Sequence, residues 1–176
     1  MSKKTDYKIL AETILKEFDF DTVLDVGCGE GYLLHHFKKA GKKVHGVDIQ
    51  QTIWCPKNEI VNNIEIRDTN KPFTHPADLV ICLEVAEHSP TPLAIIKNVI
   101  NNAKKYIIFS GAQLMQPGIG HISCLPYPIW LSYFLGCSNK IKYNLTKTIE
   151  LINKLNGKFD TCWWLLNNLM IFDMSK

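Results

Sequence analysis

The sequence lacks a long apolar run, and this excludes a bilayer-spanning protein. No apolar run approaches the roughly 18 to 20 residues that a transmembrane helix needs. The first residues, MSKKTDYKIL, also lack the apolar core of a signal peptide. We therefore expect no membrane partner and a cytoplasmic location.

Cysteine pairs and a strong charge excess are also missing. The six cysteines are scattered without a CxxC pair, which argues against a zinc ribbon or a thioredoxin-type redox centre and favours free, buried thiols. They are Cys28, Cys55, Cys82, Cys124, Cys137 and Cys162. The formal net charge is only +3 and the lysines are spread in pairs, so nucleic acid gains little support and no DNA partner is expected.

What is present is the composition of an ordinary globular domain. The chain has 176 residues, of which 46% are hydrophobic and 21% are charged. That length suffices for one sizeable core and is too short for a second full one. We expect a single domain over residues 1–176.

Helical and strand patterns alternate along the chain. Apolar residues at helical spacing predict helices at residues 5–18, 32–40, 91–102, 129–135 and 146–155. Short β-branched or continuously apolar runs predict strands at residues 22–26, 44–47, 64–66, 77–83, 106–110 and 169–172. This alternation predicts an α/β fold: a doubly wound, Rossmann-like, mostly parallel sheet with helices on both faces.

A Gly-rich turn, VLDVGCGEGY, joins the first predicted strand to its helix. Gly27, Gly29 and Gly31 lie where a doubly wound sheet binds ligands, and glycine lets the backbone approach a ligand closely. Asp25 precedes the turn and Asp48 ends the second strand, where a carboxylate can accept from both hydroxyls of a ribose. The spacing is GxGxG rather than the GxGxxG of dinucleotide-binding turns, which argues against a dehydrogenase.

The pattern D-x-G-x-G-x-G, with an acidic residue at the end of the second strand, resembles the class I S-adenosylmethionine-dependent methyltransferases of types 11, 12 and 23. The resemblance implies that the three glycines line the methionine part of the cofactor. It places Asp25 beside the cofactor's amino group and Asp48 on its ribose. The alternatives are that Asp25 orders the turn and that Asp48 caps a helix.

The same resemblance implies further cofactor contacts. Ile49 would pack on the adenine, Asp68 would accept a hydrogen bond from the adenine amine, and Leu83 would line the cofactor site. Asp68 stands in the sequence RDTNKPF, so an Asx-turn is its alternative role.

The segment LEVAEHSP follows the fourth predicted strand and carries Glu84, Glu87 and His88. In a helical turn these positions are related as i, i+3 and i+4 and would share one face. Three roles are open: caps and packing, a general base in His88, or a metal site that His121 would complete.

The Glu-x-x-Glu-His step resembles two methyltransferase groups. In the small-RNA 2′-hydroxyl methyltransferases such a step and a distant histidine hold a divalent ion, and the ubiquinone-pathway O-methyltransferases share the step. The resemblance implies metal ligands at Glu84, Glu87, His88 and His121, with His88 and His121 also as catalytic residues. Mixed carboxylate and imidazole ligands suit manganese, iron, cobalt or zinc.

Residues 111–128, GAQLMQPGIGHISCLPYP, are too long for a simple connector and predict a binding loop or lid. This loop and the downstream WWLLNNLMIF also resemble small methyltransferases of unassigned substrate. The resemblance makes five side chains candidates for a substrate wall, with core packing as the alternative: His121, Tyr127, Trp130, Trp163 and Trp164.

Together these features predict methyl transfer from S-adenosylmethionine, first to a hydroxyl oxygen of a small molecule or sugar. Metal-assisted methylation of an RNA ribose is the alternative acceptor chemistry. The Glu-x-x-Glu-His step supports it, and the lack of a basic block places it second. A non-catalytic adenosylmethionine-binding module is the alternative of another class.

Overall fold

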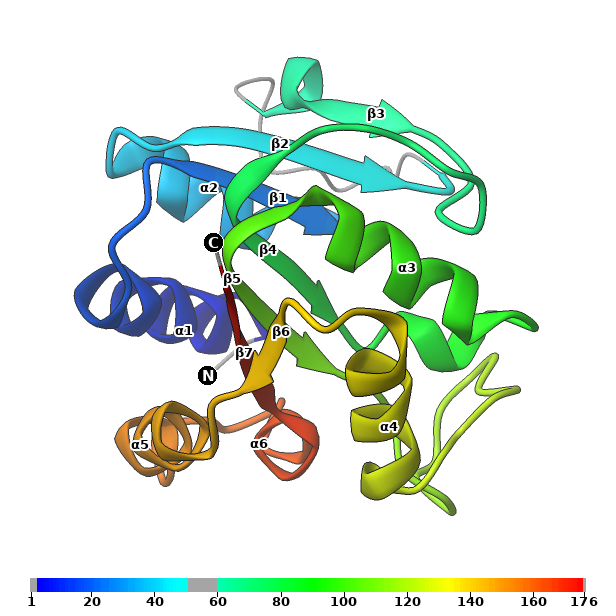
Figure 1. Cartoon of the computed structure of the whole chain (residues 1–176). Coiled ribbons are helices and arrows are strands. Elements are labelled where there is room, and N and C mark those ends of the chain that lie inside the picture. Colours follow the sequence, from blue (N-terminus) through cyan, green and yellow to red (C-terminus); the bar gives the residue numbers. More distant parts are fainter. Residues whose placement is uncertain (1–2, 51–59, 176) are drawn as a thin grey trace.

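A computed structural model describes residues 3–50 and 60–175 and confirms the α/β fold (Figure 1). In this part of the chain seven strands form one sheet in the order β3-β2-β1-β4-β5-β7-β6. The strands are β1 (Thr22–Val26), β2 (Lys43–Asp48), β3 (Ile64–Ile66), β4 (Ala77–Leu83), β5 (Ala103–Ser110), β6 (Ile141–Tyr143) and β7 (Met170–Met174).

The helices alternate with the strands as the apolar spacing predicts. The α-helices are α1 (Lys3–Glu17), α2 (Tyr32–Lys39), α3 (Pro92–Asn102), α4 (Tyr127–Cys137), α5 (Leu145–Leu155) and α6 (Trp164–Asn168). Two single 3-10 turns, η1 (Val61–Asn63) and η2 (Ala86–His88), precede β3 and α3. None of the described helices is long and apolar enough to cross a bilayer.

The sheet is mostly parallel, as predicted, with one strand reversed. The strands β1 to β5 pair in parallel, whereas β7 runs antiparallel to β5 and β6 pairs antiparallel with β7. The chain reaches β7 from β6 through α5 and α6, and β7 enters the sheet between β5 and β6. Neither α6 nor the three-residue β6 was predicted.

Helices cover both faces of the sheet (Figure 1). On one face α1, α2, α5 and α6 share a core with the sheet, in which Leu34, Phe37 and Leu155 are completely buried. On the other face α3 and α4 pack with Ile96, Trp130 and Phe134 completely buried. The core cysteine Cys82 is a buried free thiol, while Cys55 lies outside the described residues.

The connection between β3 and β4, residues 67–76, crosses one sheet face without a helix. Two buried asparagines of α3 hold it in place. Asn98 donates to the carbonyls of Thr69 and Lys71, and Asn102 donates to the carbonyl of Phe73. These bonds satisfy backbone groups that would otherwise be unpaired near the core.

The parallel strands deliver their carboxyl ends to one edge of the sheet. The register pairs Val26 with Val47 and Leu83 with Ser110, so β1, β2 and β4 end close together. The Gly-rich turn, Asp48 and the LEVAEHSP segment therefore lie at this edge, which is where ligands bind in doubly wound sheets.

Candidate active site

The Gly-rich turn has a backbone that only glycine adopts easily. Gly27, Gly29 and Gly31 have φ angles of 77°, 52° and 72°. A Cβ on Gly27 would lie 2.4 Å from a methyl carbon of Val85, so this glycine lets the turn pack on the segment after β4. A Cβ on Gly29 would meet no atom within 4 Å, so a ligand can approach the backbone there.

Two cavities meet at the turn. The larger, of about 530 Å³, has the turn on one side and the loop after β5 on the other. Its lining includes Asp25, Gly27, Gly29, Leu83, Glu84, His88, His121 and Trp164. The smaller, of about 370 Å³, lies toward β2 and shares Gly27, Glu84 and His88 with the larger one. The two cavities together are called the cleft below.

Gly31 does not line either cavity and has a structural position instead. It is the N-cap of α2, and a Cβ there would lie 3.2 Å from the Ile64 side chain. Its sequence neighbour Glu30 lines the larger cavity. The first two glycines of the motif therefore face the cleft, and the third begins the helix.

Asp48 orders the turn and also faces the smaller cavity. Its Oδ2 accepts a hydrogen bond of 2.7 Å from the amide of Gly29, and its Oδ1 accepts one from the amide of Gln50. Ile49 beside it lines the same cavity with 66% of its surface exposed. A carboxylate and an exposed apolar side chain thus lie together, as a ribose and an adenine ring require.

Asp25 is a buried acid at the floor of the larger cavity, with only 5% of its surface exposed. Burial raises the pKa of its carboxyl to about 7, and the nearby charge of Asp48 adds to this effect. A cation bound in the cavity would stabilise the charged form. The site therefore suits the ammonium group of an amino acid.

Asp68 takes the Asx-turn role rather than a place at the cleft. Its Oδ1 accepts from the amide and the side chain of Asn70, and it lines neither cavity. Thr69 and Asn70, the next two residues, line the smaller cavity instead. The signal for this was present in RDTNKPF, where an aspartate precedes a turn.

Glu84 begins the segment after β4 with a left-handed backbone, at φ 55°. Its carboxylate accepts from the side chains of Gln116 and Asn168, at 2.7 and 3.0 Å. Asn168 also donates to Gln116, which closes a three-residue polar network on one wall of the cleft. The prediction that Glu84, Glu87 and His88 share one face of a helical turn is wrong. The segment forms only the 3-10 turn η2, which begins after Glu84.

Glu87, His88 and His121 do come together. One ligand atom from each lies within 4.8 Å of the others, and Glu84 is not part of this group. The rings of His88 and His121 lie 4.9 Å apart, and His121 Nε2 is 3.9 Å from Glu87 Oε1. Glu87 is completely buried, whereas His88 is exposed at the cleft.

Neither oxygen of the buried Glu87 carboxylate makes a hydrogen bond of ordinary geometry among the described residues, and only the backbone amides of Glu87 and Ala112 approach closely enough to lower its pKa slightly. Burial raises its pKa to about 8, and the charge of Glu84 adds to this effect. A buried acid without a partner is costly unless a proton or a cation neutralises it. The arrangement therefore fits a bound cation.

Both histidines are oriented so that one ring nitrogen is available. Nδ1 of His88 lies 3.1 Å from the carbonyl of Gly120, and Nδ1 of His121 lies 3.2 Å from the carbonyl of Gln116. A carbonyl only accepts, so Nδ1 carries the proton and Nε2 keeps its lone pair in the neutral ring. Metal-ligating histidines are held in this way.

The aromatic candidates divide between cavity and core. Trp164 lines the larger cavity. Trp130 is completely buried and donates to the carbonyl of Ala112, and the Tyr127 hydroxyl bonds Tyr143 and the carbonyl of Leu169, so both serve packing. Trp163 is 60% exposed and lines neither cavity. Tyr7 and Tyr32 line the larger cavity, although no motif pointed to them.

Comparison with known proteins identifies the family. Residues 4–112, more than half of the chain, match the model of a methyltransferase domain. The chain therefore belongs to the methyltransferase-domain family. The matched residues include the whole Gly-rich turn, β2 and the LEVAEHSP segment.

Curated relatives match about half of the chain. The ubiquinone biosynthesis O-methyltransferase of Pseudoalteromonas translucida is 36% identical over 96 residues, which cover 49% of this chain and 40% of the relative. That of Vibrio cholerae is 31% identical over 111 residues, covering 57% of this chain and 39% of the relative. The chain thus spans about two fifths of the length of these relatives.

Solved structures share the fold over nearly the whole chain. An O-methyltransferase from a polyketide synthase of Brevibacillus brevis, solved with S-adenosyl-L-homocysteine, has a TM-score of 0.65 at 15% identity and covers 98% of this chain and 73% of its own. Magnesium protoporphyrin IX methyltransferase from Synechocystis has a TM-score of 0.61 at 21% identity, covering 98% and 79%. At these identities the likeness establishes the fold.

Proposed function

We propose that the protein transfers a methyl group from S-adenosylmethionine to a hydroxyl oxygen of a small molecule. The observation that carries the proposal is the junction of two kinds of site in one cleft. The Gly-rich turn with Asp25 and Asp48 lies on one side, and His88 and His121, with the buried Glu87 next to them, lie on the other.

The two cavities support a place for each part of the cofactor. The adenosine part would lie in the smaller cavity, where Asp48 accepts from the ribose hydroxyls and Ile49 packs on the adenine. The methionine part would lie in the larger cavity, with its ammonium group beside Asp25. The shared residues Gly27 and His88 would then flank the sulfonium.

The reaction is one displacement. The acceptor oxygen forms a bond to the methyl carbon while the carbon–sulfur bond breaks, and the electron pair goes to sulfur. The acceptor loses its proton. Without an ion, the free Nε2 of His88 would take it, and with an ion bound to His88 the proton would pass to water. The polar network of Glu84, Gln116 and Asn168 fixes the wall against which donor and acceptor align, and alignment supplies much of the rate.

We further propose that Glu87, His88 and His121 hold a divalent ion beside the acceptor. The unpartnered carboxylate of Glu87 and the available Nε2 atoms fit an ion that prefers mixed ligands, such as manganese or zinc. Such an ion lowers the pKa of a bound hydroxyl. Glu84, which the sequence suggested as a fourth ligand, is held by Gln116 and Asn168, which would leave a position for the acceptor.

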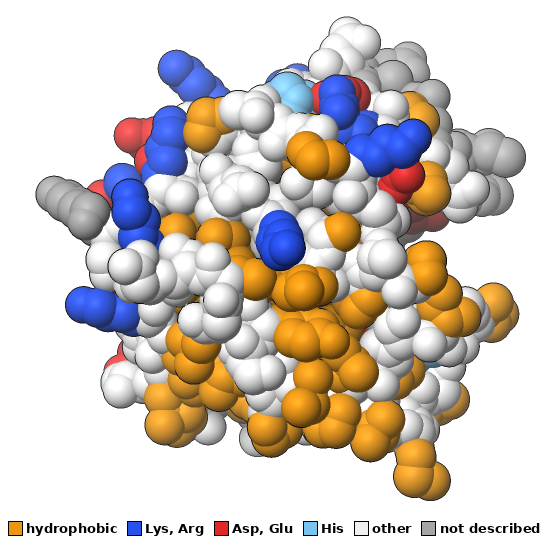
Figure 2. All heavy atoms as spheres, turned by 45° about the vertical axis from the view of Figure 1, so that its right-hand side comes forward, with side chains coloured by type: hydrophobic (Ala, Val, Ile, Leu, Met, Phe, Trp, Pro, Cys, Tyr) orange, Lys and Arg blue, Asp and Glu red, His pale blue; other side chains and the backbone are white. Residues whose placement is uncertain are grey.

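The loop after β5 favours an apolar acceptor over RNA. No Lys, Arg, Asp or Glu occurs in residues 111–137, and Leu114, Met115 and Ile119 of this stretch are 60% to 100% exposed. Figure 2 shows apolar side chains gathered over the lower part of this side of the molecule, away from most of its lysines and arginines. RNA binding depends on basic side chains along the phosphates, which this rim does not offer.

Two names among the relatives agree with this choice of acceptor. The curated relatives are ubiquinone biosynthesis O-methyltransferases, and one structural neighbour is an O-methyltransferase of a polyketide synthase. We carry over the small-molecule oxygen acceptor from them as part of the proposal. The single-domain organisation over 1–176 and the cytoplasmic location also stay predictions.

The test follows the label from the donor. The full chain is incubated with S-adenosylmethionine carrying a labelled methyl group and with separated pools of small phenols, apolar alcohols, sugars and RNA. We expect label in an apolar hydroxylated compound, and none with Asp48→Ala, which should also lose S-adenosylhomocysteine binding in calorimetry. Label in RNA would favour the ribose alternative, and cofactor binding without transfer to any pool would favour a binding module.

A further inference from the structure

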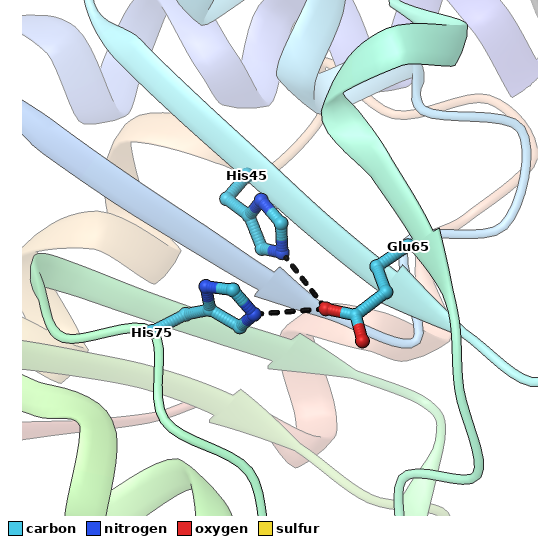
Figure 3. Close-up of side chains that lie close together, drawn as sticks. All are labelled: His45, Glu65 and His75. Carbon is cyan, nitrogen blue, oxygen red and sulfur yellow. Dashed lines mark hydrogen bonds and ion pairs between the residues drawn. The ribbon is translucent and has the colours of Figure 1, made fainter.

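A second cluster of metal-ligating side chains lies outside the cleft. His45 on β2, Glu65 on β3 and His75 in the connection before β4 meet over one face of the sheet (Figure 3). None of them lines either cavity. Nothing in the proposed methyl transfer uses them.

The three side chains point at one place. Nε2 of His75 lies 2.8 Å from Glu65 Oε2, and Nε2 of His45 lies 3.6 Å from the same oxygen. In Figure 3 both imidazole rings direct this nitrogen toward the carboxylate. The rings stack with their centroids 3.8 Å apart, which holds the two nitrogens side by side.

One of these nitrogens has no hydrogen bond. Nε2 of His45 is buried and makes no hydrogen bond of ordinary geometry among the described residues, since its neighbour Glu65 Oε2 lies 3.6 Å away. A buried polar atom without a partner is uncommon and calls for an explanation such as an ion. The three side chains are still about one third exposed, so an ion from solvent can reach them.

The surrounding residues fix the cluster from outside. Arg67 donates to the other oxygen of Glu65, Oε1, which leaves Oε2 to face the histidines. The backbone amide of His75 donates to Asn102 of α3, and the strand register places Glu65 opposite Val47 on β2. Partners of this kind orient metal ligands in known sites.

We propose that His45, Glu65 and His75 bind one transition-metal ion, with zinc as the best fit. Two imidazoles and one carboxylate match zinc's ligand preferences, and water would complete a tetrahedron. Metal–ligand bonds of about 2.0 to 2.2 Å place neighbouring ligand atoms about 3.3 Å apart. The observed separations of 3.6 and 2.8 Å bracket that value, so small side-chain rotations suffice.

The ion would add a link between β2, β3 and the connection 67–76, beyond the strand pairing and the asparagine hydrogen bonds that already hold them in place. The strand β3 is only three residues long and lies at the edge of the sheet, and the connection 67–76 has no helix. A bound ion stabilises the folded chain in proportion to its concentration relative to the dissociation constant. The site is therefore a structural metal site that joins β2, β3 and the connection before β4.

The experiment first removes the proposed metal ligands of the cleft by substitution. The full chain with Glu87→Gln and His121→Ala is stripped with a chelator, desalted and titrated with zinc alone. We expect one zinc per chain by elemental analysis and a rise in Tm of several degrees. Cobalt in place of zinc should give the visible absorption of a tetrahedral site.

The matched variants carry one further change each. Adding His75→Gln or His45→Gln should abolish the bound zinc and the rise in Tm, while adding His36→Gln, a half-buried histidine on α2, should change neither. Circular dichroism checks that each variant is folded. Absence of stoichiometric zinc in the chain with Glu87→Gln and His121→Ala, or full zinc binding retained after His45→Gln or His75→Gln is added, would overturn the site. Because the readout is metal content and stability, the result does not depend on methyl transfer.

Discussion

The cleft and the outer edge of the sheet treat their carboxylates in opposite ways. At the cleft, Asp25 is buried at the floor and Glu87 is buried behind the cleft histidines, and burial raises their pKa values to about 7 and about 8. At the edge, Glu65 is partly exposed and accepts from Arg67 and His75, which lower its pKa. The same functional group is thus uncompensated in one region and neutralised in the other.

The difference separates a site built for a ligand from a site built into the fold. Uncompensated buried acids destabilise a free protein and are therefore typical of functional sites. In this chain each of the two lies where the proposal puts a cation: an ammonium at Asp25 and a metal ion at Glu87. Glu65 already has its counter-charge, so an ion there would add stability rather than make a reaction possible.

The largest expected effect is on the rate of methyl transfer, which should depend on the cleft cluster (Glu87, His88 and His121) and not on the edge cluster (His45, Glu65 and His75). Glu87→Gln keeps the shape of the side chain but removes its charge, so the cleft ion should be lost and methyl transfer should fall about 100-fold or more. Glu65→Gln should leave the rate unchanged. The measurement is the rate of label transfer in manganese or zinc. An unimpaired Glu87→Gln enzyme would refute a role for the cleft ion.

The second expected effect concerns cofactor affinity and pH. Pairing with an ammonium requires charged Asp25, so affinity for S-adenosylmethionine should fall by up to about tenfold per pH unit as the pH drops below about 7. In Asp25→Asn the affinity should be weak and should not change between pH 5 and 7. Calorimetry across this range decides it, and an equally steep profile in Asp25→Asn would assign the dependence to another group.

The parts of the site that a short motif carries could be predicted from the sequence. The Gly-rich turn, Asp25 and Asp48 owe their positions to the end of one buried strand and the start of the next, and a parallel sheet brings those ends together. Most helices and strands were predictable for the same reason, since their apolar spacing decides which face is buried. The exceptions, β6 and α6, are too short to show a period.

The parts that depend on distant contacts could not be predicted. Gln116 and Asn168 bond Glu84 from positions 32 and 84 residues away. His45, Glu65 and His75 come from three separate elements, and no spacing relates them. Asp68 was predicted at the cavity, but Thr69 and Asn70 line it instead. This difference of one or two residues depends on the Asx-turn that Asp68 forms with Asn70.

The third expected effect is on the free energy of unfolding, which should depend on pH because Asp25 is buried without a counter-charge. The folded pKa of Asp25 lies above its unfolded value of 3.8, so the folded chain binds the extra proton and its stability falls as the pH rises from about 4 to 7. Asp25→Asn should remove the part of the fall that Asp25 causes, leave the part that Glu87 causes, and raise the free energy of unfolding at pH 8 by on the order of a few kcal/mol. Urea denaturation of chelator-treated chains at pH 5 and pH 8 measures it. A less stable Asp25→Asn chain at pH 8 would count against an uncompensated charge.

The smallest effect has the opposite sign and belongs to Glu65. Its folded pKa lies below the unfolded value of 4.5, so its stabilisation is present above that value and is lost as the pH falls through the lower folded pKa. Because the pair with Arg67 is partly exposed, Glu65→Gln should destabilise the chelator-treated chain by no more than about 1 kcal/mol at pH 7, and the difference should shrink in acid. Zinc should enlarge the difference at pH 7, since only the unsubstituted chain keeps all three ligands. If zinc leaves it unchanged, the edge cluster is an ion pair and nothing more.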